Sequence, residues 1–114
     1  MRIYLAVVAL SLMFFGCSSD ETKQVKSKNS LDCQILKTAE VRCIFKTPRV
    51  NKTQGIEFHW ISPSDKKDNR TRVITLDKNH ATVYDERHTT GRASGVWQVK
   101  ATLNGEVSST SFRL

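Results

Sequence analysis

The chain has 114 residues, with 18 Lys or Arg and 11 Asp or Glu, so its formal net charge is +7. This length allows one small domain and excludes a second independent core. The positive charge suits anionic partners such as phosphates, acidic glycans, lipid head groups or nucleic acid, but it also serves solubility alone. The charge is scattered, and the pair Lys66-Lys67 is its densest point.

Residues 1–16 are expected to form a leader that is removed from the mature protein. One positive charge, Arg2, precedes an apolar run from Ile3 to about Phe15. This is the pattern of a secretory signal peptide, and the run is short for a membrane-spanning helix. A retained anchor helix is the alternative, and the polar sequence that begins at Cys17 argues against it.

The leader ends in Gly16-Cys17, which resembles the cleavage and acylation site of bacterial lipoproteins. The resemblance implies that Cys17 becomes the first residue and carries palmitate and other acyl chains, which anchor the protein in the cell envelope. Ser18 follows the cysteine instead of Asp, which favours the outer membrane in a Gram-negative source and leaves periplasmic and surface positions open. Phe14 departs from the family pattern, which usually has Leu there. Ordinary secretion with an odd free cysteine is the alternative.

Residues 17–30 are predicted to be a lipidated, flexible linker. From Ser18 to Ser30 the sequence contains a single apolar side chain, Val25. Such a stretch cannot bury enough surface to offset the entropy lost on ordering. The linker therefore holds the folded domain near the membrane surface without embedding it.

Residues 31–114 show apolar and polar side chains in alternation, as in Ile56, Phe58 and Trp60. Period-2 alternation with β-branched and aromatic residues predicts half-buried strands, and Asn104-Gly105 predicts a hairpin turn. The mature chain has no comparable helical stripe, so the fold class is expected to be all-β, a small seven-stranded sandwich. The strands are expected at about 31–37, 40–47, 55–62, 71–77, 80–86, 95–103 and 106–114.

Three stretches resemble immunoglobulin-like and fibronectin type III-like domains. Trp60 in the third strand resembles their buried tryptophan, and the segment 58–65 resembles their tryptophan–proline–turn stretch. The segments 95–107 and 112–114 resemble the last hairpin of bacterial Ig-like envelope domains. The resemblance implies an Ig-like architecture and no particular activity. No cysteine lies on the predicted sixth strand, so the inter-sheet disulfide of antibody domains is not expected.

Cys33 and Cys43 remain once Cys17 is acylated, an even number in an exported chain. A three-residue turn centred on Thr38 would place these two cysteines opposite each other on adjacent strands. A cross-strand disulfide is therefore predicted. Free thiols and a redox or metal-binding pair are the alternatives, and the absence of a Cys-x-x-Cys motif disfavours the redox pair.

No catalytic, cofactor-binding or metal-binding residue is predicted, and the protein is not expected to be an enzyme. The spacing of His59, His80 and His88 matches no local metal-ligand motif. The carboxylate pairs Asp85-Glu86 and Asp65/Asp68 are interpreted as solvated charges of strand edges and turns. The sequence has no glycine-rich phosphate loop and no Gly-x-Ser-x-Gly motif.

Two predicted loop regions carry the candidate ligand contacts, which would form one cationic rim if the sandwich placed both at the same end. Aromatic residues do not interleave with these charges, which disfavours nucleic acid and leaves an anionic glycan or a protein as the ligand. The candidate residues are Arg49, Lys52, Lys66, Lys67, Arg70 and Arg72.

These patterns predict a membrane-anchored bacterial lipoprotein that acts as a non-enzymatic binding or assembly module in the cell envelope. Its partner is expected to be another envelope protein, bound through edge strands or loop ends. The alternative is a periplasmic or surface inhibitor or sensor that binds a soluble enzyme or an anionic glycan.

Overall fold

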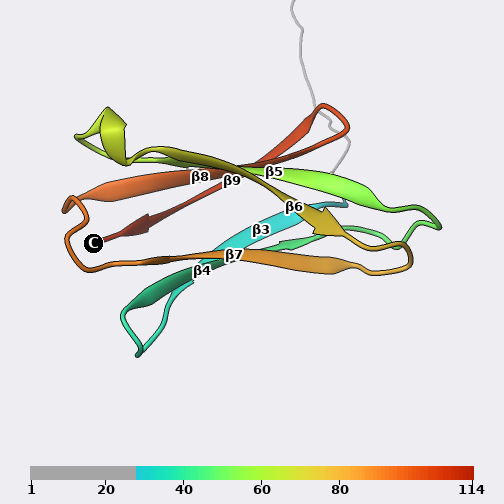
Figure 1. Cartoon of the computed structure of the whole chain (residues 1–114), viewed down its shortest axis with the longest axis horizontal. Coiled ribbons are helices and arrows are strands. Elements are labelled where there is room, and N and C mark those ends of the chain that lie inside the picture. Colours follow the sequence, from blue (N-terminus) through green and yellow to red (C-terminus); the bar gives the residue numbers. More distant parts are fainter. Residues whose placement is uncertain (1–27) are drawn as a thin grey trace, which may run out of the picture.

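The computed structural model describes residues 28–114, which form seven strands and one short 3-10 helix (Figure 1). The predicted leader, the lipidation residue Cys17 and the linker up to residue 27 lie outside the described residues. Within residues 28–114, no helix is long and apolar enough to span a membrane. The elements are β3 (Ser30–Ile35), β4 (Glu40–Lys46), β5 (Gln54–Ile61), η2 (Lys66–Asp68), β6 (Arg70–Leu76), β7 (Thr82–His88), β8 (Val96–Leu103) and β9 (Glu106–Arg113).

The strands form two antiparallel sheets that pack face to face, with the orders β3-β4-β7 and β6-β5-β8-β9 (Figure 1). This confirms the predicted all-β, seven-stranded sandwich, and the arrangement is compatible with an immunoglobulin-like fold. All seven strands lie within two residues of their expected bounds. The strand expected at 80–86 begins and ends two residues later, because the preceding turn is longer than expected: Asn79 has a φ of 64° and the amide of His80 donates to the carbonyl of Asp77 at 3.1 Å.

The core lies between the sheets and consists of the inward residues of each alternating strand. In β5 and β8, every second side chain is buried and its neighbours face outward. Phe112 lies edge-on to Trp60 and stacks on Trp97, with ring centroids 5.9 and 6.0 Å apart. The buried apolar residues are Leu31, Val41, Cys43, Phe45, Ile56, Phe58, Trp60, Leu76, Trp97, Val99, Ala101 and Leu103.

The β3–β4 hairpin contains the disulfide bond. Cys33 lies directly opposite Cys43, their Cα atoms are 4.0 Å apart, and their sulfur atoms are bonded. The turn closes through a 2.7 Å hydrogen bond from the amide of Leu36 to the carbonyl of Glu40, with Ala39 at a φ of 65°. This confirms the predicted pairing. The bond joins two strands of one sheet and does not cross between sheets.

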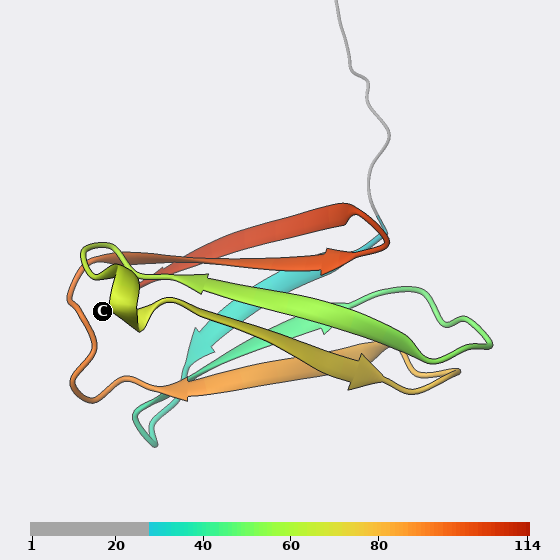
Figure 2. The same cartoon turned by 45° about the horizontal axis from the view of Figure 1, so that its top comes forward.

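The sandwich has two ends, which we name for the description of the surface. The near end contains residues 28–30, 46–53, 77–82 and 103–106, and the far end contains residues 35–40, 61–70, 88–96 and 113–114. In Figure 2, the loops of the near end and those of the far end project from opposite sides of the strands. The first described residues therefore lie at the near end, and the carboxyl terminus lies at the far end.

Candidate functional site

The loop between β5 and β6 lies at the far end and is closed by hydrogen bonds between its own residues. The amide of Ser62 donates to the side-chain oxygen of Asn69 at 2.7 Å, which closes the base of the loop. The carboxylate of Asp65 accepts the amide of Lys67 at 2.9 Å and caps the 3-10 turn. The loop therefore has a defined conformation and presents Lys66 and Lys67, both exposed, to solvent.

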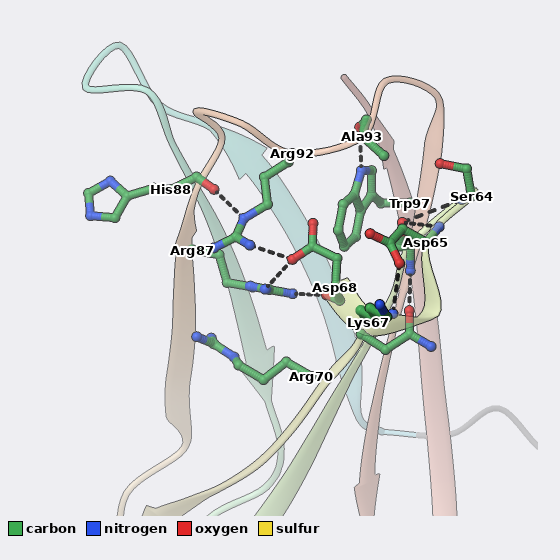
Figure 3. A network of polar contacts seen from close by, with 12 residues as sticks. Ser64, Asp65, Lys67, Asp68, Arg70, Arg87, His88, Arg92, Ala93 and Trp97 are labelled. Atoms are coloured by element: carbon green, nitrogen blue, oxygen red, sulfur yellow. Dashed lines mark hydrogen bonds and ion pairs between the residues drawn. The ribbon is translucent and has the colours of Figure 1, made fainter.

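Asp68 attaches this loop to the opposite sheet (Figure 3). Arg87, on β7, donates to the carbonyl of Asp68 at 2.8 Å and to its carboxylate at 3.0 Å. Arg92 also donates to this carboxylate, and its Nε donates to the carbonyl of His88 at 3.0 Å. One carboxylate is thus shared by two guanidinium groups, which fixes the loop relative to β7 and to the β7–β8 connection.

Arg87 is buried among aromatic rings. Its guanidinium carbon lies 5.8 Å from the ring centre of Trp60 and 5.6 Å from that of Trp97, and 8% of its side chain is exposed. Burial lowers the pKa of Arg87, and repulsion from Arg92 and Arg70 lowers it further, while Asp68 opposes these effects. Arginine nevertheless stays charged in proteins, and the faces of the two tryptophans replace part of its lost hydration.

A buried carboxylate, Asp85, lies two residues before Arg87 on the same inward face of β7. It accepts a 2.9 Å hydrogen bond from Nε1 of Trp60 and a 2.8 Å hydrogen bond from Arg70. Arg72 approaches its other oxygen at 3.7 Å. Asp85 is 3% exposed, so this carboxylate ties β7 to β5 and β6 across the interior of the sandwich.

The interpretation of these acidic residues as solvated charges was therefore wrong for two of them. Asp85 is opposite Cys43 in the register of β4 and β7, so its side chain faces the core. Asp68 is ion-paired at the base of its loop. Glu86 does face outward, where it pairs with Arg42, and this contact raises the pKa of Arg42.

The structure does not bring the six candidate ligand contacts together. Arg49 and Lys52 lie at the near end, while Lys66 and Lys67 lie at the far end, because the two loops flank opposite ends of β5. The condition for a single cationic rim, that both loops lie at the same end of the sandwich, is therefore not met. The remaining two candidates, Arg70 and Arg72, contact the buried Asp85.

The histidines do not form a cluster. His59 is on the outward face of β5, opposite Thr71 and Lys100. His80 lies in the near-end turn, and His88 ends β7 with its Nδ1 3.9 Å from a carboxylate oxygen of Glu40. Among residues 28–114, no group of three or more His, Cys, Asp or Glu residues could hold a metal ion.

The space at the far end, between the two tryptophans and Arg87, is too small for a substrate. This cavity measures about 10 Å³, enough for one water molecule at most. The exposed feature of the far end is instead its loop 62–69. This loop presents two ammonium groups on a backbone whose conformation is fixed by the partly buried ion pairs of Asp68.

Sequence reasoning missed the ion pairs of Asp68 with Arg87 and Arg92 and the buried position of Asp85. The sequence did indicate where Asp85 and Arg87 point. Both lie at every second position after Val83 on β7, so the three side chains are on the same face of the strand. The partnership of Asp68 with Arg92 has no such signal, since both residues lie outside the strands. No protein-family model matches the chain, and a search of curated proteins found no match.

Proposed function

We propose that this chain is a lipid-anchored protein of the bacterial cell envelope whose sandwich is a non-enzymatic binding or assembly module. One observation carries the proposal. The chain has three cysteines, and two of them, Cys33 and Cys43, are bonded to each other. The third, Cys17, follows Gly16 at the end of an apolar leader, the position that acylation of a lipoprotein requires. In a Gram-negative source, Ser18 favours the outer membrane as the destination.

The sandwich is proposed to be of the fibronectin type III kind. Counted along the described chain, the fourth strand (β6) pairs with the third (β5). The first, second and fifth strands (β3, β4 and β7) therefore form one sheet, and the other four strands form the second. In constant-type immunoglobulin domains the larger sheet contains the first and second strands instead. This architecture supports many functions, so the proposal of binding depends on the surface of the domain.

The far end is the proposed contact surface. Its loop 62–69 is fixed by the ion pairs of Asp68 before any partner arrives, so little conformational entropy is lost on binding. Lys66 and Lys67 project from it without a carboxylate partner among the described residues. Two exposed cations on a rigid loop fit an acidic surface of another envelope protein, where they would govern association rate and specificity.

The anchor is tested by labelling cells with palmitate and separating membrane from soluble proteins. Wild-type protein is expected to incorporate the label and to remain with the membranes. Cys17→Ala should lose the label, whereas the double variant Cys33→Ala/Cys43→Ala should keep it. Equal labelling of wild type and Cys17→Ala would contradict the proposed anchor.

The binding function is tested by affinity purification from detergent-solubilised membranes after mild crosslinking. A membrane protein is expected to co-purify at a fixed ratio, and Lys66→Glu/Lys67→Glu should reduce its recovery. Recovery of a soluble enzyme or a glycan alone would favour the inhibitor or sensor function instead. Undiminished recovery with the double variant would show that the partner contacts another surface.

A further inference from the structure

The near end of the sandwich carries a concentrated positive charge that the protein itself does not neutralise. Its acidic residues are Asp77 and Glu106. Within residues 28–114, none of the near-end cations forms an ion pair, in contrast to the arginines at Asp68 and Asp85. These exposed cations, which we call the near-end cations, are Lys28, Lys46, Arg49, Lys52 and Lys78.

The two loops that carry three of these cations are joined into one surface. Arg49 donates from Nη1 to the carbonyl of Asn79 at 2.6 Å, and the amide of Asn79 donates to the carbonyl of Val50 at 2.7 Å. A third bond of 2.9 Å runs from the amide of Thr47 to the carbonyl of Ala81. Figure 2 shows the loops projecting together beyond the sheets, in green and gold.

An apolar side chain lies among the charges of this surface. Val50 is 37% exposed and is flanked in sequence by Arg49 and, two residues later, by Lys52. Cations around a solvent-exposed apolar residue are the combination that binds the interface of an anionic bilayer, because the charges meet the phosphates while the apolar group enters the boundary region.

The position of the chain's first described residues ties this surface to the proposed anchor. Thr47 donates from its hydroxyl to the side-chain oxygen of Asn29 at 2.6 Å, so the chain meets the sandwich at the near end. Ten residues separate Cys17 from Lys28, a span of at most about 40 Å when extended. A lipid on Cys17 would hold the near end close to the head groups and raise their effective concentration.

We propose that the near end docks on anionic phospholipid head groups, with Val50 at the interface, so that the far end points away from the membrane. This inference rests on the proposed lipid anchor. Docking by the near-end cations is electrostatic, so it should weaken when salt shortens the Debye length from about 10 Å at 0.1 M to about 3 Å at 1 M. Neutral bilayers offer no counter-charge and should leave the near end in solvent.

The test uses the full-length protein, purified in detergent and reconstituted into vesicles of phosphatidylcholine alone or mixed with phosphatidylglycerol. An environment-sensitive fluorophore is placed on Val50→Cys and, as a matched control at the opposite end, on Lys67→Cys. The Val50 label is expected to shift to the blue and brighten in the anionic vesicles only, and to lose this response at high salt. The Lys67 label is expected to stay unchanged.

The charge-reversal variant Arg49→Glu/Lys52→Glu should reduce the Val50 response to the level of the Lys67 control. If the charge-reversal variant does not fold, the salt dependence of the Val50 label in the protein with Arg49 and Lys52 intact tests the same electrostatic contact. A Val50 label that reads the same in neutral and anionic vesicles would overturn the docking. So would an equal response to soluble polyphosphate without vesicles, because the occupant would then be a phosphate and not a bilayer.

Flotation of the vesicles separates this inference from the proposed anchor. Protein that floats with neutral vesicles but shows no lipid-dependent Val50 response refutes the docking and leaves the anchor standing. Protein that does not float with neutral vesicles refutes the anchor. In that case the Val50 label, read while anionic vesicles are added to the unanchored protein, still decides whether the near end binds them.

Discussion

Two adjacent carboxylates of β7, Asp85 and Glu86, have opposite environments. Asp85 is 3% exposed and accepts hydrogen bonds from Trp60 and Arg70. Asp85→Ala leaves the buried Nε1 of Trp60 and the half-buried guanidinium of Arg70 without their acceptor, so it should lower the free energy of unfolding by about 3 kcal/mol. Glu86→Ala removes a partly exposed ion pair and should cost no more than about 1 kcal/mol. Urea unfolding followed by tryptophan fluorescence measures both.

Equal effects of these two neighbouring substitutions would show that the buried hydrogen bonds of Asp85 do not contribute to stability. The variant Asp85→Asn gives a further check, because it keeps an acceptor for Trp60 while removing the charge that faces Arg70. It is expected to fall between wild type and Asp85→Ala.

Asp68 and Asp65 provide a second matched pair, within a single loop. Asp68 accepts from both Arg87 and Arg92, whereas Asp65 caps a short turn through the amide of Lys67. Asp68→Ala should lower the free energy of unfolding by about 2–3 kcal/mol, because Arg87 is left buried without an anion. Asp65→Ala removes only the cap and should cost about 1 kcal/mol or less.

Thermal unfolding of the two variants measures this difference directly. If Asp68→Ala and Asp65→Ala had the same melting temperature, the ion pairs of Asp68 would not hold the loop. Lys66→Ala, which removes an exposed side chain of the same loop, is the control for changes unrelated to either carboxylate.

The inward position of Asp85 could have been read from the sequence, but the partners of Asp68 could not. Alternation along β7 puts Val83, Asp85 and Arg87 on one face, and an acid and a base two residues apart on an inward face must find partners. The predicted strand, 80–86, ended before Arg87, so the alternation of Asp85 with Arg87 was not visible within it. The bonds between Asp68 and Arg92 join two loops, and their geometry depends on the packing of both sheets.

At the scale of the elements, the β3–β4 hairpin is joined by the disulfide of Cys33 and Cys43. The double variant Cys33→Ser/Cys43→Ser removes a bond that closes a loop of about 11 residues, which corresponds to about 2.8 kcal/mol in the chain-entropy model. The midpoint of urea unfolding should fall accordingly, and reduction of the wild type should produce the same fall. An unchanged midpoint in both cases would contradict a stabilising role.

The β8–β9 hairpin depends on two residues with positive φ, Asn104 at 52° and Gly105 at 80°. Gly105→Ala should cost about 1–2 kcal/mol because an L side chain disfavours this conformation. The cost would come from the backbone alone, since a Cβ there meets no atom within 4 Å. Asn104→Gly, which keeps the turn accessible, should change stability little. Denaturant unfolding of the two variants distinguishes backbone conformation from a general sensitivity of the turn.

At the scale of the whole molecule, the arrangement of the ends follows from the direction of the strands. Successive antiparallel strands place their connections alternately at the two ends, so the loops before and after β5 lie at opposite ends. The order of the seven strands is therefore enough to place the cations of these two loops at opposite ends, where they cannot form a single rim. The sequence pattern did not specify which strands share a sheet, because pairings such as β4 with β7 and β5 with β8 join strands that are distant in the chain.

The two ends of the sandwich should therefore act independently. They are separated by the eight residues of β5, about 26 Å at 3.3 Å per residue, and effects at sites this far apart usually add. Lys66→Glu/Lys67→Glu should reduce partner recovery and leave the lipid response of the Val50 label intact. Arg49→Glu/Lys52→Glu should abolish that response and leave partner recovery from detergent intact, because no bilayer orients the protein there. A variant that impaired both measurements while keeping its unfolding midpoint would show that one continuous surface serves both contacts.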